Sequence, residues 1–181
     1  MRKIRRVLLS LVLAVLLVIG LTMPLAAANP TVTITISAQI VSIANTQDTW
    51  TAPPVTAGQA AIYWSADGYS EDDDYSQIEN TGNVAVDVEI QGTDFEGGSW
   101  DWTLGTSAGN QTYSLYANSG NGTSTYDVEV KSSSYGDITT DLAVDATYDW
   151  SMKLTPPTWF DPADDGSSKT ATVTLVASKH T

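Results

Sequence analysis

Two short stretches of the sequence concentrate carboxylates of the kind that bind metal ions. The first is residues 65–80, and the second is FDPADDG at residues 160–166, which holds three aspartates. Neither stretch has the spacing of an EF-hand. Ca²⁺ takes about six to eight oxygen ligands, often from flexible loops. The first stretch, residues 65–80, therefore predicts a calcium site, and calcium is the one candidate cofactor. The alternative is a solvated acidic turn. Its candidate ligands are Asp67, Glu71, Asp72, Asp73 and Asp74.

Tryptophans form a second set of candidate binding residues. Trp100 and Trp102 lie two apart in a predicted strand, and Trp159 lies in the proline-bounded loop PPTWFDP. Exposed tryptophan rings can stack on sugar rings, whereas buried ones fill a core, and burial is the commoner fate. Trp64 and Trp150 alternate in phase with apolar neighbours, so we expect both in the core.

Catalytic groups are scarce in this sequence. The only histidine, His180, is next to the last residue, where chains are usually mobile, and there is no cysteine. No zinc helix, nucleophile elbow, phosphate loop or dinucleotide fingerprint occurs. A glycosidase needs only two carboxylates, but nothing in the sequence places two of them across a sugar. We therefore predict no catalytic residues and no enzyme.

The N-terminus has the pattern of an export signal. A basic start, an apolar stretch and small residues at 26–28 predict a cleaved signal helix over residues 1–28, with an uncleaved anchor as the alternative. The remaining chain keeps four lysines against 21 acidic residues, a formal net charge of −17. Such a surface repels nucleic acid and anionic lipid. We expect a secreted, extracellular or cell-surface protein without membrane contact after cleavage, and Asn110 and Asn121 lie in glycosylation sequons at predicted turns.

Alternation of apolar and polar residues dominates the rest of the chain. Each alternating segment has one apolar and one polar face, which is typical of antiparallel sheets. We predict an all-β fold, a single antiparallel β-sandwich of immunoglobulin-like or jelly-roll type, over residues 45–181. The strands are expected at residues 83–91, 125–131, 146–154 and 170–177, with further strands at 59–66, 99–104 and 112–117.

An unusually long alternating run opens the predicted mature chain, within residues 29–44. It extends from Thr31 to Ala44, and its apolar phase slips by one residue near Ile40. We expect the second half to belong to the domain and the first half to project as a donor strand for another subunit. The alternative is an ordinary first strand paired within its own domain. The side chains that would be donated are Val32, Ile34 and Ile36.

Three segments of the chain carry a family resemblance: TVTITIS (31–37), IENTGNVAVDVEI (78–90) and TATVTLVAS (170–178). With them the chain resembles the camelysin-like biofilm-matrix fibre proteins and the archaeal bundling pilins. The resemblance implies a β-sandwich subunit whose N-terminal segment inserts into the next subunit. Some of that family is labelled as metallopeptidase, a label not carried over because no zinc-ligand motif is present. A weaker likeness to WxL cell-wall-binding domains rests on Trp102-Thr103-Leu104.

These observations leave two functions in competition. The first is a structural subunit of an extracellular fibre or surface layer, a homopolymer that assembles head-to-tail by donating its N-terminal strand. The second is a monomeric module, with or without calcium, that binds glycans or cell wall through Trp100, Trp102 or Trp159. Deleting the donor segment should separate them, because only the first function depends on it.

Overall fold

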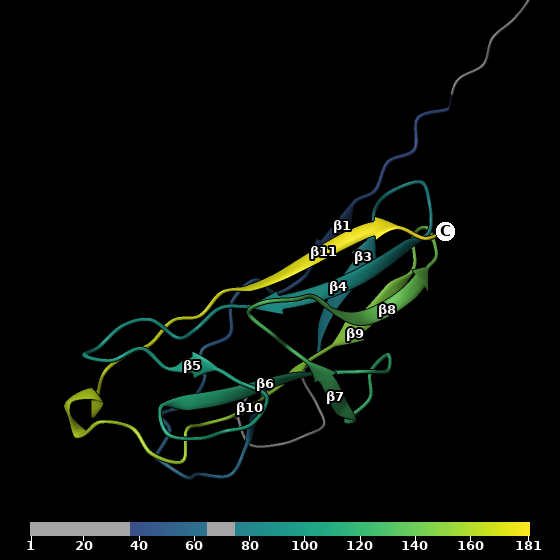
Figure 1. Ribbon diagram of the computed structural model, residues 1–181. Helices are drawn as coiled ribbons and strands as arrows, with labels where there is room; N and C mark the ends of the chain where they lie inside the picture. Colours follow the sequence, from purple (N-terminus) through teal and green to yellow (C-terminus); the bar gives the residue numbers. More distant parts are fainter. Residues whose placement is uncertain (1–36, 65–74) are drawn as a thin grey trace, which may run out of the picture. The chain divides into compact units, whose positions relative to one another are not determined.

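The computed structural model describes residues 37–64 and 75–181 (Figure 1). Contacts within the chain divide it into two units, Met1–Ser37 and Ala38–Thr181. The second unit holds every strand of the described residues and one short 3-10 helix, η1 (Pro162–Asp164), so the fold is all-β. No helix in these two described ranges is long and apolar enough to cross a membrane.

The first of three sheets, sheet C, is wholly antiparallel and contains the longest unbroken pairing. Its strand order is β11 (Val173–Lys179), β4 (Val86–Gly92) and β8 (Gly136–Leu142). β11 and β4 pair over all seven residues without a shift, whereas the β4–β8 ladder shifts register twice. Figure 1 shows β4 between the other two strands.

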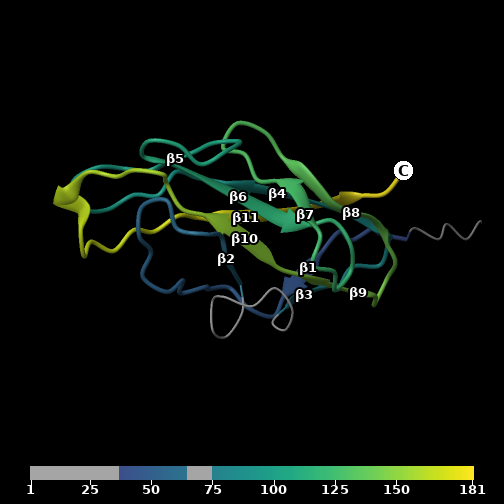
Figure 2. The same cartoon turned by 90° about the horizontal axis from the view of Figure 1, so that it is seen from below.

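Sheet A is smaller and brings the N-terminal part of the domain against its middle. It contains β1 (Ile43–Asn45), β3 (Ser76–Asn80) and β9 (Thr147–Trp150) in that order, all antiparallel. In Figure 2, β1 and β3 lie on one side of the domain and β8 lies on the other.

Sheet B includes the one parallel strand pair of the three sheets. Its five strands are β2 (Ile62–Tyr63), β5 (Thr103–Leu104), β6 (Thr112–Asn118), β7 (Tyr126–Glu129) and β10 (Met152–Thr155). Its order is β2, β10, β6 and β5, with β7 also paired to β6. β5 and β6 run parallel, and the other pairs are antiparallel.

The core consists of the apolar faces that the alternation predicted. Val86, Val88 and Ile90 of β4 are fully buried, while the residues between them are only partly covered. All three sheets contribute to a single cluster of buried side chains, which includes Trp64 and Trp150 as expected. Burying these faces removes about 25 cal/mol of unfavourable hydration per Å² of apolar surface.

Several predicted strands are confirmed, and others are shorter than predicted. Some strands of the structure were not predicted at all. The predicted strand at 146–154 is divided into β9 and β10 by Ser151, which was expected to face solvent but is buried. Its amide donates to Asn118 Oδ1 at 2.8 Å, and its hydroxyl lies 2.8 Å from Tyr126 Oη, so its polar groups are satisfied. The segment 99–104 pairs as a strand only at Thr103–Leu104.

β3 and β8 were not predicted from the sequence. β3 lies at the end of the acidic stretch, where SQIEN shows only one strongly apolar residue, Ile78. β8, GDITTDL, carries threonine and aspartate at most positions and has no regular alternation. Pairing with β4 therefore determines β8, not its own sequence pattern, which agrees with the strong context dependence of strand propensity.

Candidate functional site

The outer edge of β11 is unpaired among the described residues. Thr93 N donates to Thr172 O at 3.0 Å, and His180 N donates to Ala85 O at 2.9 Å, so even-numbered residues of this strand bond to β4. Successive residues of an antiparallel strand direct their peptide groups to opposite sides. Residues 173, 175, 177 and 179 therefore direct theirs away from β4, where residues 37–64 and 75–181 provide no backbone partner.

The side chains of this edge strand are incompletely covered. Val173, Leu175 and Ala177 pack against the core cluster, yet each remains only half-buried. Their neighbours on the central strand β4 are fully buried. The apolar side chains are therefore shielded from solvent at β4 and only partly shielded at β11. This pattern is expected of a sheet edge that can accept one more strand.

The second half of the N-terminal run is held by the turn between β3 and β4. Asn83 Oδ1 accepts from Ile40 N at 2.6 Å, Asn83 Nδ2 donates to Ala38 O at 2.8 Å, and Asn83 N donates to Ile40 O at 3.0 Å. Thr81 N also donates to Ser42 O at 3.0 Å. We call these hydrogen bonds between residues 38–42 and the turn the bracket. They hold the chain directly after the predicted donor segment.

A partly buried polar contact holds the next part of the same run. Asn45 Oδ1 accepts from Ser76 Oγ at 2.6 Å and from Trp150 Nε1 at 3.0 Å. Ser76 and Trp150 are both buried, so this contact joins β1 to β3 and β9. Two apolar side chains before it, Ile40 and Val41, are 54% and 40% exposed.

Two groups of predicted site residues lie outside the described residues. The donor side chains Val32, Ile34 and Ile36 precede residue 37, and the predicted calcium ligands Asp67, Glu71, Asp72, Asp73 and Asp74 lie between residues 64 and 75. Both assignments stay predictions. In the described ranges, no group of three or more acidic or histidine side chains is arranged to hold a metal ion.

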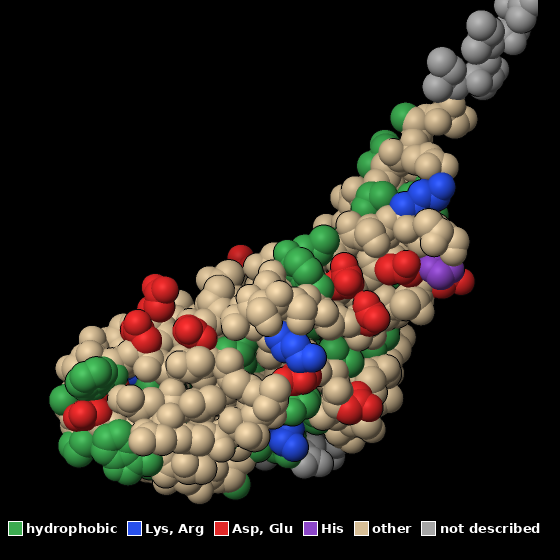
Figure 3. All heavy atoms as spheres, in the orientation of Figure 1, with side chains coloured by type: hydrophobic (Ala, Val, Ile, Leu, Met, Phe, Trp, Pro, Cys, Tyr) green, Lys and Arg blue, Asp and Glu red, His purple; other side chains and the backbone are tan. Residues whose placement is uncertain are grey.

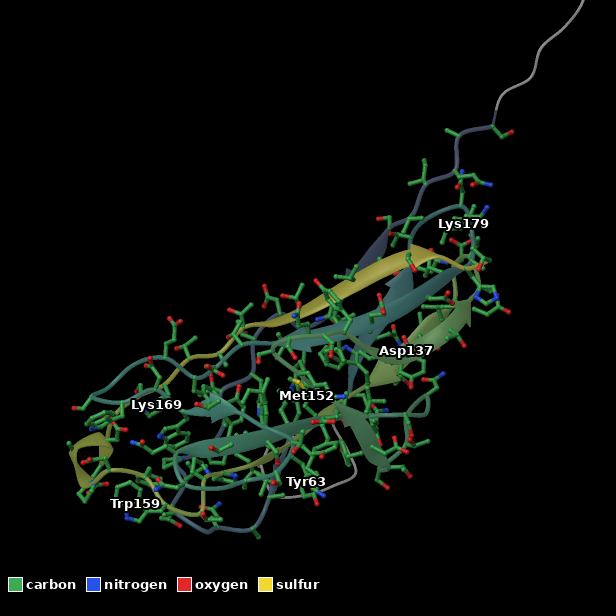
Figure 4. The ribbon with its side chains drawn as sticks, in the orientation of Figure 1. Tyr63, Asp137, Met152, Trp159, Lys169 and Lys179 are labelled. Atoms are coloured by element: carbon green, nitrogen blue, oxygen red, sulfur yellow. The ribbon has the colours of Figure 1, made fainter. Side chains whose placement is uncertain are left out.

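One end of the domain carries two exposed tryptophans, which we call the aromatic tip. Trp100 and Trp159 are 53% and 48% exposed. Trp102 is only 7% exposed and stacks on Phe160, with ring centroids 5.2 Å apart. Of the three tryptophans predicted to contact glycans, the ring of Trp102 is therefore core, and only the other two face solvent. Figure 3 shows hydrophobic side chains at this end, and Figure 4 places Trp159 and Lys169 there.

A buried ion pair supports the aromatic tip. Lys169 Nζ lies 3.2 Å from Asp164 Oδ2, and both side chains are almost fully buried. Asp164 Oδ1 accepts from Ser99 N at 2.8 Å and Trp100 N at 3.2 Å. Burial disfavours the charged form of Asp164, but the hydrogen bonds from Ser99, Lys169 and Trp100 outweigh it and lower the pKa of this carboxyl.

Lys169 also contacts the loop that carries Trp100. Its ammonium donates to the carbonyls of Gly97 and Trp100 and lies 5.2 Å from the centre of the Trp102 ring. Asp164, from the second acidic stretch, FDPADDG, is therefore part of a structural ion pair. This pair could not be predicted, because neither residue occurs in a sequence motif that identifies the other as its partner.

His180 lies at the opposite end of the domain from the aromatic tip and is held in place. Its Nδ1 lies 2.7 Å from Asp87 Oδ1, and Figure 3 shows acidic side chains beside it. The hydrogen bond to Asp87 is the main cause that raises the pKa of His180. The expectation of a mobile chain end does not hold here, since β11 continues to Lys179 and His180 N bonds to Ala85.

Comparison of the chain with protein-family models, curated proteins and solved structures found no match. The functional assignment therefore depends on two surfaces of this domain: the open edge at β11 and the aromatic tip.

Proposed function

We propose that the protein is a secreted structural subunit of an extracellular fibre or surface layer, assembled head-to-tail by donation of its N-terminal β-strand. In this proposal sheets A and B act as one layer of a sandwich and sheet C as the other. Two features support the layering: only Ser151 separates β9 from β10, and all three sheets share one buried cluster.

The observation that carries the proposal is how the N-terminal run is attached. The chain divides between Ser37 and Ala38, and Ala38 to Ser42 is bracketed by Asn83 and Thr81. In the sequence, the apolar alternating segment Thr31–Ser37 directly precedes these hydrogen-bonded residues. A tethered strand of this kind is suited to pairing with an exposed edge of another subunit.

The free energy available to such a contact is substantial. Burying Val32, Ile34 and Ile36 would contribute about 1.5–3 kcal/mol each before ordering costs, and main-chain hydrogen bonds would add to this. A head-to-tail contact that does not close on itself extends into an open filament. The resemblance to the camelysin-like fibre proteins and archaeal bundling pilins agrees with this assembly.

The test compares two triple substitutions in the protein that begins at Asn29. Replacing Val32, Ile34 and Ile36 with serine removes the apolar face, while replacing Thr31, Thr33 and Thr35 with serine leaves that face and the length unchanged. Electron microscopy at rising protein concentration should show filaments for the parent and the threonine-face variant only. Filaments of the apolar-face variant would overturn the proposal, as would a strictly monomeric parent protein.

A second candidate function rests on the exposure of Trp100 and Trp159 at the aromatic tip. In this candidate the protein is a module that binds neutral glycans through these rings, since a strongly acidic surface disfavours anionic polymers. It predicts that Trp100→Ala and Trp159→Ala each weaken retention on neutral polysaccharide, while Tyr135→Ala, an equally exposed aromatic elsewhere, does not. Equal retention of all three variants would exclude it.

A further inference from the structure

We propose that the strand donated by one subunit, Thr31–Ser37, pairs with the outer edge of β11 in the next subunit, with Ile34 opposite Leu175. This inference rests on the proposed function and adds the acceptor surface and the register of pairing. The occupant of the open edge is thus a segment of a second copy of the same chain.

The length and the alternation of the two segments agree. With Ile34 opposite Leu175, the seven residues of the donor segment Thr31–Ser37 face residues 172–178 and so cover six of the seven residues of β11, Val173–Lys179. β11 directs three side chains, Val173, Leu175 and Ala177, toward the core, and each remains half-buried. The donor has three apolar side chains at the same spacing of two. Placing Ile34 opposite Leu175 puts all three pairs on the core face in either strand direction.

Apart from Lys179 at its end, β11 lacks the features that protect sheet edges from pairing. Its residues Val173 to Ser178 carry no charge and no proline, and its ladder with β4 has no bulge. Edge strands are usually blocked by charges, prolines or bulges. A donor segment that is itself uncharged meets neither repulsion nor an irregular backbone at this edge.

The opposite edge of sheet C is protected. The β8 ladder shifts register twice, and Asp141 in this strand has a φ of 56°, which bends the backbone out of the extended conformation. Asp137 and Asp141 are exposed on the same strand. The edge strands of sheet A, β1 and β9, have only three and four residues. Among the described strands of these two sheets, β11 is therefore the edge that best fits a seven-residue donor.

Disulfide trapping tests the acceptor, because the chain has no cysteine of its own. With Ile34 opposite Leu175, Thr33 faces Val176 if the strands are antiparallel and Thr174 if they are parallel. Both acceptor positions lie on the face away from the core, so cysteine there disturbs little packing. Facing residues of this kind lie about 4.5 Å apart between Cα atoms in an antiparallel non-hydrogen-bonded pair, within disulfide range.

The experiment uses three double variants of the protein that begins at Asn29: Thr33→Cys with Val176→Cys, Thr33→Cys with Thr174→Cys, and Thr33→Cys with Thr140→Cys on β8 as the matched control. After mild oxidation, non-reducing gels should show a ladder of covalent oligomers for one of the β11 pairs and none for the β8 pair. Which β11 pair gives the ladder identifies the direction of the strands.

Three results would overturn the inference. A ladder from the β8 pair, or filaments without a ladder from either β11 pair, would leave the fibre intact and place the acceptor elsewhere. A disulfide within single monomers from a β11 pair would show that the segment fills its own domain, which would also remove the proposed function.

Discussion

His180 Nδ1 lies 2.7 Å from Asp87 Oδ1, so a contact between side chains joins the end of β11 to its neighbour β4. The same Asp87 oxygen accepts from Asp141 N at 2.9 Å, and His180 Nε2 lies 4.0 Å from Asp141 Oδ1. One imidazole thus faces two carboxylates, one from β4 and one from β8, and connects all three strands of sheet C at one end.

This cluster predicts a pH dependence of stability. The hydrogen bond with Asp87 raises the pKa of His180 above its ordinary value of about 6.5. The contribution of His180 to the stability of the fold is therefore complete below about pH 6.5 and is lost as pH rises through the raised pKa. Hydrogen bonds from Asp141 and His180 lower the pKa of Asp87, so its contribution is present above about pH 4 and is lost as pH falls through the lowered pKa.

Urea unfolding of the parent protein and of His180→Gln at pH 6 and pH 9 tests this dependence. Because repulsion within an acidic protein also changes with pH, the informative quantity is the difference between the two proteins. We expect the parent to lose more stability than the variant between the two pH values. An identical loss in both proteins would contradict a stabilising role of the His180–Asp87 pair.

The ion pair beneath the aromatic tip predicts a clear contrast between two lysines. Lys169→Met should lower the melting temperature by several degrees, because the Asp164 carboxylate would remain buried without its cation. Lys131→Met removes an exposed partner of Glu129, at 3.2 Å, and should change stability by less than about 1 kcal/mol. Thermal unfolding followed by circular dichroism measures both, and equal effects would contradict the structural role of Lys169.

Two tryptophans that are near each other in sequence should differ sharply when replaced. Trp102→Ala should destabilise the domain by about 3–5 kcal/mol, because the ring is buried between Phe160 and Phe95. Trp100→Ala removes an exposed ring and should cost less than about 0.5 kcal/mol. Urea unfolding monitored by far-ultraviolet circular dichroism compares the two, and similar losses would mean that Trp100 also packs in the core.

Gly82 is predicted to be essential for the bracket around residues 38–42. A Cβ atom added there would lie 2.3 Å from Ile40 O and 3.1 Å from Ser42 N, both backbone atoms that cannot rotate away. Gly82→Ala should therefore displace the bracketed segment and increase amide hydrogen exchange at Ile40 and Asn83, while β4 stays protected. In the control Gly109→Ala, the nearest atom lies at 3.6 Å, and exchange at these amides should not change.

Local sequence determined which faces are apolar, because side chains of a strand alternate with a period of two and only one face can be buried. The burial of Val86, Val88 and Ile90, and of Trp64 and Trp150, follows from that pattern. The period-two alternation was less informative at Trp100 and Trp102. Both were expected on one face of a strand, but regular strand pairing begins only at Thr103.

Tertiary structure alone decided the contacts that define the candidate sites. That β4 lies between β11 and β8, that Asn83 holds Ala38, and that Lys169 pairs with Asp164 all depend on residues brought together by packing. Alternation carries no information about which strand becomes the partner of another, since hydrogen bonding between strands is the same for every sequence. An open edge is a property of the finished sheet, and no segment of the chain encodes it alone.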